Sequence, residues 1–260
     1  MNADKRGSKT NALSAFVGVL PRPEAAFNKR GVQVVNGYLP PFRCMELLQA
    51  ISEYRRSHTL PLINRQERGR SLRYMVIDGD RIHEHLPDFE ALYADVNTAV
   101  NSLSGMVLQP LANRGAGVNI NITPPGGEYR WHYDRNAVTA ILYLNESAGG
   151  ETEMYPNYRI HLGRWKHTRV QRWLDAPLRR DIALHLFARK LVVAPQPGLL
   201  IAMRGDRCLH SVRPVDGPGE RINVVMTFDL PGAVFHVEKN LDPYLYSRDN
   251  APAFDPNYRP

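Results

Sequence analysis

Hydrophobic residues recur at helical spacing in two segments of the first half of the chain. Between residues 40 and 56 the apolar positions fall on one face of a helix, and Pro41 suits its first turn. A second stripe runs over residues 88–103, with Asp88 as a candidate N-cap and Gly105 as a candidate terminator. The pattern therefore predicts two helices before the chain reaches Gly105.

Beyond Gly105, short apolar or alternating segments stand between Gly and Pro turns, with the length and period of β-strands. The eight segments are 107–111, 117–123, 128–132, 138–144, 191–194, 199–203, 210–215 and 221–229. Such a series favours an antiparallel barrel or jelly roll. The expected fold class is therefore mainly β with supporting α-helices. Residues 157–190 interrupt the series and carry a helical pattern over 173–189.

The chain divides at about residue 30. Residues 1–30 are polar and basic and contain Pro21 and Pro23, so we expect a loosely held N-terminal arm. Residues 31–260 have the length of one domain, whose jelly-roll core covers about 105–232 and includes the helical basic insertion 157–190.

Composition narrows the class of protein. Among the 260 residues, 43% are hydrophobic and 23% are charged, which favours a packed core over disorder. Two cysteines, Cys44 and Cys208, are too few for a disulfide framework or a multi-cysteine zinc site. No apolar run approaches the roughly 18 residues of a membrane-spanning helix. We therefore expect a cytoplasmic protein with no membrane partner.

A candidate metal site begins in the segment Trp131-His132-Tyr133-Asp134, at the end of a predicted strand. Positions i and i+2 of a strand share a face, so His132 and Asp134 can converge on one point. His210 is the best candidate for a third ligand from elsewhere. Two imidazoles and one carboxylate, with open positions opposite, suit a non-haem ferrous ion. The alternative is that each histidine is an ordinary polar or capping residue.

Arg221 opens the last apolar strand, eleven residues after His210. A guanidinium pointing into a barrel requires a carboxylate partner, and its geometry suits a bidentate pair. Shorter motifs lie between the histidines and before Arg221, namely Tyr-Leu-Asn at 143–145, Gly-Gly-Glu-Thr at 149–152 and Gly-Leu-Leu at 198–200.

This ordered set resembles the iron(II)/2-oxoglutarate dioxygenases, most closely the prolyl-4-hydroxylase-like branch, over about residues 105–232. The resemblance implies a double-stranded β-helix core of the jelly-roll or cupin-like type, with iron(II) held by His132, Asp134 and His210. It also implies that Arg221 pairs with the distal carboxylate of the cosubstrate 2-oxoglutarate, where close relatives of the prolyl branch often use Lys.

The resemblance adds three candidate cosubstrate contacts: Asn121, Tyr143 and Thr227. Asn119 and Asn121 alternate on one strand and share a face. Some members of the family place an Asn at the second of these positions, although they usually follow it with a Tyr where this chain has Thr123. For Tyr143 and Thr227 the alternative is core packing.

By the same resemblance, the reaction uses dioxygen to decarboxylate 2-oxoglutarate oxidatively, which yields succinate and carbon dioxide. This step is coupled to hydroxylation of a C–H bond of the substrate. Ascorbate is a candidate reductant. Asp134 argues against radical halogenation, because halogenases of the superfamily carry Gly or Ala at the carboxylate position. Thr227 stands where alkyl-repair members usually carry a second Arg, which argues against nucleic-acid demethylation.

We expect the substrate to be a small molecule, either an amino acid or a natural-product intermediate. A peptidyl or protein hydroxylase of the prolyl type is the second reading, and a nucleic-acid partner held by a basic helix is the third. Desaturation, ring formation and epimerisation run on the same iron centre and are not separated from hydroxylation by the sequence.

The net charge of +7 is concentrated in the insertion, where nine Lys or Arg of residues 157–190 face two Asp. An insertion between strands could overhang the barrel mouth as a lid, so we expect an anionic or polar substrate. The alternative is a solvated basic cover packed on the barrel. Candidate substrate contacts that flank the motifs are Trp131, Arg135, Tyr155 and Arg213, together with Arg130, and their alternative role is packing at the barrel rim.

Overall fold

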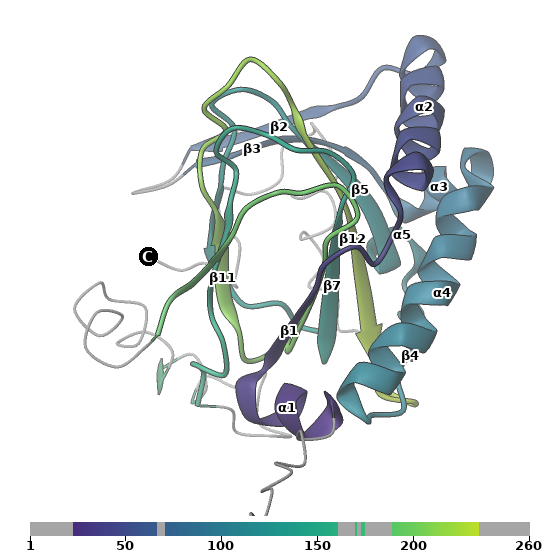
Figure 1. The fold of residues 1–260 in the computed structure, drawn as a ribbon. Helices are drawn as coiled ribbons and strands as arrows, with labels where there is room; N and C mark the ends of the chain where they lie inside the picture. Colours follow the sequence, from purple (N-terminus) through teal and green to yellow (C-terminus); the bar gives the residue numbers. More distant parts are fainter. Residues whose placement is uncertain (1–22, 67–70, 161–169, 171–172, 175–188, 234–260) are drawn as a thin grey trace, which may run out of the picture.

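Two antiparallel β-sheets face each other in the computed structural model, which describes residues 23–66, 71–160, 170, 173–174 and 189–233 (Figure 1). The larger sheet contains, in spatial order, β1 (Val32–Val35), β10 (Leu200–Met203), β7 (Val138–Tyr143), β12 (Arg221–Asp229), β5 (Val118–Thr123), β3 (Ser71–Ile77) and β2 (Leu62–Gln66), with β4 (Gln109–Pro110) paired to the end of β12. The smaller sheet contains β6 (Tyr129–His132), β11 (Leu209–Val212), β8 (Thr152–Tyr155) and β9 (Leu191–Val193). This arrangement is the expected jelly roll, so the predicted fold class is confirmed.

Alternation along β12 shows how the larger sheet separates its two faces. Val224, Met226 and Phe228 are buried in the core that the sheet shares with the helices. Arg221 and Asn223 point the other way, toward the smaller sheet, because successive strand residues face opposite sides. The chemistry-bearing residues therefore lie between the two sheets.

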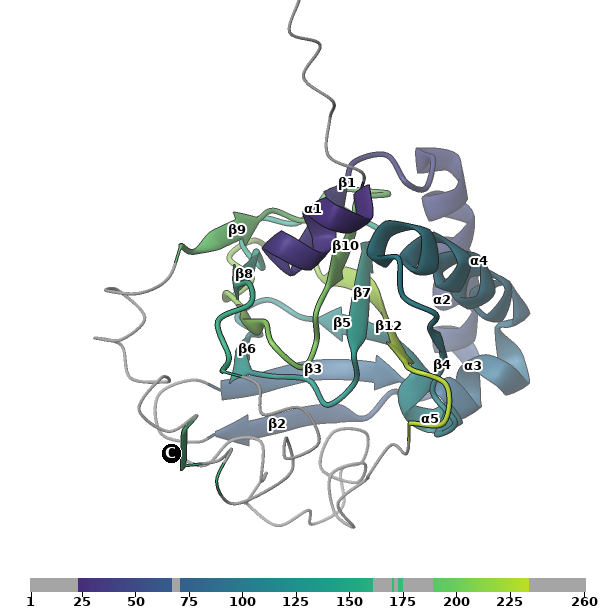
Figure 2. The same cartoon turned by 90° about the horizontal axis from the view of Figure 1, so that it is seen from below.

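Helices cover the outer face of the larger sheet, on the side away from the smaller sheet (Figure 2). The covering elements are α2 (Pro41–Ser57), α3 (Gly79–His85), α4 (Pro87–Ser104) and the short α5 (Arg114–Gly117). Leu47 and Ile51 of α2 and Phe89 and Val96 of α4 are buried in this layer. Each such side chain contributes about 1.5–3 kcal/mol through removal of apolar surface from water.

Both predicted helices are confirmed, but one cap is not. Gly105 ends α4 in the left-handed conformation, at φ 64°, as expected. Asp88 is not the N-cap, because the chain turns directly from α3 through Leu86 and begins α4 at Pro87. Proline suits the first turn, because the N–H that it lacks would have no partner within the helix. No side chain caps the start of α4.

The N-terminal arm was predicted too long. Residues Pro23–Arg30 form helix α1, and Phe27 is fully buried in the core beside α4. The side chain of Asn28 donates to the carbonyl oxygen of Ser104 at 3.3 Å, which fixes α1 against the end of α4. Burial of an aromatic ring anchors this segment despite its polar, basic composition.

All eight predicted strands are present, although their ends shift by a few residues. Four further strands were not predicted: β1, β2, β3 and β8. Three of them lie before residue 105 and extend the larger sheet at both edges, so the sheet is not confined to residues 105–232.

Much of the basic insertion lies outside the described residues. The predicted helix over 173–189 and the lid hypothesis fall largely on residues 161–169, 171–172 and 175–188, so they stay predictions. The division of the chain into an arm and one domain at residue 31 also stays a prediction, apart from the correction at α1. Among the helices that the structure describes, none combines the length and hydrophobicity needed to cross a lipid bilayer.

Candidate metal centre and cosubstrate site

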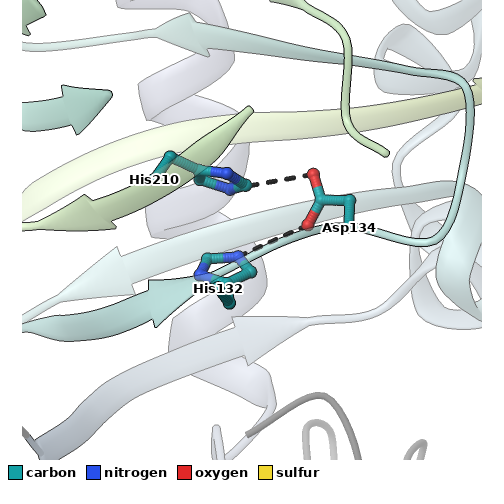
Figure 3. A group of neighbouring side chains, drawn as sticks. All are labelled: His132, Asp134 and His210. Carbon is teal, nitrogen blue, oxygen red and sulfur yellow. Dashed lines mark ion pairs between the residues drawn. The ribbon is translucent and has the colours of Figure 1, made fainter. Parts of the chain in front are cut away.

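Three potential metal ligands meet between the sheets, on the smaller sheet's inner face (Figure 3). His132 ends β6 and lies directly opposite His210 of β11 in the strand register. Asp134 follows β6, and its carboxylate oxygens lie 3.3 Å from Nε2 of His132 and 3.7 Å from Nε2 of His210. One ligand atom from each residue lies within 4.8 Å of the other two, so the three can hold one ion.

Each imidazole is oriented by its own strand. Nδ1 of His132 lies 3.0 Å from the carbonyl oxygen of Arg130, and Nδ1 of His210 lies 3.1 Å from that of Cys208. A carbonyl oxygen only accepts, so Nδ1 carries the proton and donates in both rings. Each Nε2 then faces the Asp134 carboxylate and is the ring nitrogen available to a metal ion.

Asp134 is held from two sides. The Thr139 hydroxyl donates to its carboxylate at 2.5 Å, and the Asn136 amide donates to the same hydroxyl at 3.0 Å. The backbone N–H of Asp134 donates to the carbonyl oxygen of Gly205 at 3.0 Å. Gly205 comes so close that an added Cβ would lie 2.8 Å from Thr139 Oγ1 and 3.0 Å from Asp134 Cβ, so a side chain there would displace the ligand.

The charge states of this group suit a divalent ion. Burial raises the pKa of the Asp134 carboxyl, but His210, His132 and the Thr139 hydroxyl outweigh burial and hold that pKa below its ordinary value. Burial, with His132 adding to it, lowers the pKa of His210 to about 4, so this imidazole is neutral at pH 7. Two imidazole nitrogens and one ionised carboxylate form the donor set that non-haem ferrous iron prefers.

Arg221 lies at the start of β12 and is only 2% exposed. Its guanidinium donates to the side-chain oxygen of Asn223 at 2.5 Å and to the Thr152 hydroxyl at 3.1 Å, and it lies 5.0 Å from the centre of the Tyr143 ring. Nε has no hydrogen-bond partner, and no carboxylate among the described residues forms an ion pair with Arg221. A buried guanidinium without an anion is costly, so its surroundings fit a ligand carboxylate.

The predicted cosubstrate residues divide into two groups. Tyr143 packs under Arg221 and shares a 2.5 Å hydrogen bond with Thr152. Asn121 lies in the same row across the sheet, because it pairs in register with Asn223. Thr227 lies near the far end of β12 and donates to the carbonyl oxygens of Ala116 and Gly117 at 2.9 and 3.0 Å, so its hydroxyl supports the fold and not the Arg221 site.

Three of the predicted substrate contacts lie on the outer face of the smaller sheet, away from the metal group. Trp131 and Tyr155 pack against each other and against Leu209, on the outer face, with ring centroids 5.2 Å apart. Arg213 donates to Glu153 at 2.6 Å on that same outer face. Adjacent strand residues point to opposite sides, so a neighbour of His132 in sequence is directed away from the metal site. Arg135 is half-buried in the loop after Asp134, and Arg130 is buried in β6.

Several functional neighbours were not selected from the sequence. Thr139, Thr152 and Asn223 complete the two sites described above, and the alternation from Arg221 to Asn223 was the available signal for the last of them. Tyr129 also lies beside the metal group, with its ring centroid 4.6 Å from that of His132. A bulge causes this placement, because three steps along β6 oppose two along β11, from His132–His210 to Tyr129–Val212. Alternation alone could not predict it.

The thiol of Cys208, two residues before His210, is free and buried. It lies in the apolar cluster with Tyr143 and Met154, and burial raises its pKa, so the thiolate is disfavoured.

Comparisons with known proteins agree with this geometry. The family model of the 2OG-Fe(II) oxygenase superfamily matches residues 118–228. The solved epimerase SnoN from nogalamycin biosynthesis, which is alpha-ketoglutarate dependent, is 13% identical, with 80% of this chain and 82% of that chain covered and a TM-score of 0.63. A prolyl-4-hydroxylase from Pseudomonas putida is 20% identical, with 80% and 97% covered and a TM-score of 0.53. A prolyl hydroxylase from Trichoplax adhaerens, solved with a hypoxia inducible factor peptide, is 17% identical, with 80% and 87% covered and a TM-score of 0.55. A search of curated protein sequences finds no match.

Proposed function

The chain belongs to the 2OG-Fe(II) oxygenase superfamily through residues 118–228, and from this premise we propose that it hydroxylates a C–H bond of a small molecule. The observation that carries the proposal is the pairing of two sites between the sheets. One is the His132, Asp134 and His210 group, and the other is the buried guanidinium of Arg221, which forms no ion pair with a carboxylate of the described residues. The first suits iron(II), and the second suits the distal carboxylate of 2-oxoglutarate.

When bound, iron(II) and 2-oxoglutarate supply the oxidising power that inserts oxygen from dioxygen into a C–H bond, with release of succinate and carbon dioxide. The residues of the chain orient and enclose these groups. His132 and His210 present Nε2 because their Nδ1 protons are held by backbone carbonyls. Thr139 holds one carboxylate oxygen of Asp134, and Asn223 and Thr152 hold the Arg221 guanidinium for a bidentate contact.

The enclosure of the metal group supports a compact substrate. The side chains of His132, Asp134 and His210 are only 13%, 18% and 5% exposed. Tyr129 closes the side next to His132, and Tyr74 packs behind it with ring centroids 5.6 Å apart. A ligand group this far from solvent favours a small molecule, which can enter a narrow approach with its reacting carbon first.

A peptidyl hydroxylase is the second candidate, because prolyl hydroxylases share the fold. The neighbours also include biosynthetic enzymes such as SnoN, so the fold itself is compatible with both substrate classes. The expectation of an anionic or polar substrate and the nucleic-acid reading depend on the basic insertion, most of which lies outside the described residues.

The test uses the full-length protein loaded anaerobically with iron(II). Addition of 2-oxoglutarate should produce a metal-to-ligand absorption band, and a true substrate should perturb it. Screening amino acids and natural-product intermediates against prolyl peptides then separates the two substrate classes. Absence of the band in the wild type would contradict the proposed enzyme class, while perturbation by peptides alone would overturn the small-molecule proposal. Ascorbate is added in the turnover assay as the candidate reductant.

A further inference from the structure

Asn145 stands where the sheet ladder beside Arg221 ends. Strand β7 finishes at Tyr143, which pairs in register with Asn223, and the N–H of Leu144 still donates to the carbonyl oxygen of Ile222 at 3.0 Å. One residue further, the main chain of β7 turns away. Arg221 would therefore start β12 without a main-chain partner on this side.

The side chain of Asn145 takes the place of that partner. Its amide nitrogen donates to the carbonyl oxygen of Glu220 at 2.7 Å, and its amide oxygen accepts from the N–H of Ile222 at 2.8 Å. The carboxamide thus bonds the main chain on both sides of Arg221, and its N–H and C=O stand in for backbone groups that a neighbouring strand would supply. No other hydrogen bond of the Asn145 side chain competes with these two among the described residues.

A second contact holds the same point from outside the barrel. Arg55, in the last turn of α2, makes a two-pronged ion pair with the Glu220 carboxylate, at 2.6 and 3.0 Å. Glu220 is therefore fixed through its side chain by α2 and through its carbonyl by Asn145. The opposite edge of the Arg221 main chain pairs with Thr123 of β5.

From this arrangement we propose that Asn145 is a positioning residue for the cosubstrate, acting through the main chain of Arg221. The inference rests on the proposed function, because it assigns Arg221 to the distal carboxylate of 2-oxoglutarate. Arg221 has little other freedom. Gly150 packs so close that an added Cβ would lie 2.7 Å from Arg221 Cδ, and Asn223 and Thr152 receive two of its N–H groups. A displacement of the main chain at residue 221 therefore moves the guanidinium as a whole.

Asn101 provides a matched control. This half-buried asparagine also clamps a main chain with both ends of its amide, since it donates to the carbonyl oxygen of Leu108 at 3.1 Å and accepts from the N–H of Leu108 at 2.6 Å. Leu108 precedes β4, which pairs with the far end of β12. Asn101→Ala should thus reproduce the cost in stability without touching the Arg221 end.

The experiment measures the Kd of 2-oxoglutarate from the anaerobic iron(II) absorption band, together with iron affinity and the melting temperature. We expect Asn145→Ala to raise the Kd by about tenfold or more, with iron affinity unchanged, because a displaced guanidinium loses the geometry of its bidentate carboxylate contact. Asn101→Ala should lower the melting temperature and leave the Kd within about twofold of the wild type. Binding of 2-oxobutyrate, which lacks the distal carboxylate, should be equally weak in the wild type and in Asn145→Ala.

A double-substitution cycle completes the test. In an Arg221→Ala background, Asn145→Ala should change the Kd by less than about twofold, because no guanidinium is left to position. If Asn145→Ala does not fold, Asn145→Asp keeps the acceptor for Ile222 but sets a carboxylate oxygen against the Glu220 carbonyl oxygen, so it should also raise the Kd by about tenfold or more. An unchanged Kd in a folded Asn145 variant, or an equal loss for 2-oxobutyrate, overturns the inference. A wild type that binds iron but shows no band with 2-oxoglutarate contradicts the proposed function instead.

Discussion

The two faces of the smaller sheet use the same strands for opposite purposes. On the inner face, His132, His210 and Thr152 belong to the proposed metal and cosubstrate sites. On the outer face, the alternate residues Trp131 and Tyr155 pack against each other, and Glu153 pairs with Lys190 and Arg213. The difference teaches that one step along a strand separates a site residue from a residue of the supporting layer.

Charge is balanced differently on the two faces. Glu153 on the outer face is only 1% exposed and is paired with Lys190 and with Arg213, with the Ser211 hydroxyl donating at 3.3 Å. Arg221 between the sheets is equally buried, yet no carboxylate among the described residues pairs with it. A satisfied charge stabilises the fold, whereas a charge that lacks its counter-ion is available to a ligand.

The largest effect should come from the metal ligands. His132→Ala, Asp134→Ala or His210→Ala should abolish 2-oxoglutarate-linked succinate formation, because each removes one of three donors to iron. Ser211→Ala, one step away on the outer face, should retain activity. Succinate release measured under saturating iron checks this pair, and full turnover in any ligand variant would contradict the assignment of that ligand.

Two arginines give the next contrast. Arg221→Ala should raise the 2-oxoglutarate KM by about ten- to a thousandfold, since a paired buried carboxylate loses its partner. Arg213→Ala should leave that KM unchanged, because this side chain is 43% exposed and faces Glu153. Steady-state kinetics with varied 2-oxoglutarate measures both. Equal effects of the two substitutions would show that the faces do not differ in function.

Substitutions of the adjacent β8 residues Thr152 and Glu153 should differ in 2-oxoglutarate binding, but by a smaller factor. Thr152→Val removes the hydroxyl that accepts from Arg221, and it should raise the 2-oxoglutarate Kd by about five- to tenfold. Glu153→Gln should leave the Kd within about twofold but lower the free energy of unfolding by about 1–3 kcal/mol. Ligand titration and urea denaturation of both variants give the comparison, which fails if Glu153→Gln weakens binding as much as Thr152→Val does.

Glu153 should also give the outer face a dependence on pH. Burial raises the pKa of its carboxyl, but Lys190 and Arg213 outweigh burial and lower that pKa below its ordinary value. Ionised Glu153 therefore supports the fold above the ordinary range of a glutamate, and this support is lost as the pH falls through the lowered pKa. Urea denaturation from pH 7 to pH 3 should show a shallower acid loss in Glu153→Gln, and parallel curves would contradict this role.

The smallest effect on kinetics is expected for Trp131 and Tyr155, the predicted substrate contacts that lie on the outer face. Tyr155→Phe and Trp131→Phe keep the packing of the outer face, so the KM for the substrate and for 2-oxoglutarate should change by less than about twofold. Kinetics with the substrate identified from the screen measures this. A rise of tenfold or more in the substrate KM would restore these residues as substrate contacts.

Local patterns predicted much of the fold. The helices over 40–56 and 88–103 have clear apolar stripes, and all eight predicted strands are present. The missed strands depend on distant partners. Thr152–Tyr155 is buried on both sides only because β11 and β9 flank it, and β1 becomes a strand by pairing with β10. Such long-range pairing leaves little trace in a segment as short as these four-residue strands.

The candidate site was predictable where the chemistry is distinctive. His132, Asp134, His210 and Arg221 have residue types that are expensive to bury without a function. The supporting residues Thr139 and Thr152 are common in sheets, and only the register brings their hydroxyls to Asp134 and Arg221. Trp131, Tyr155 and Arg213 were chosen for their nearness in sequence, and alternation places them on the other face.

The bonds from each histidine Nδ1 to the carbonyl oxygen two residues earlier have a further consequence. Both are local to three consecutive residues and require no metal ion. The imidazoles therefore need little reorganisation when iron enters, and their ligand nitrogens are already aimed at a common point. Metal uptake should be limited by access and by dehydration of the ion, and another divalent ion with similar ligand preference should occupy the same three donors without a change of fold.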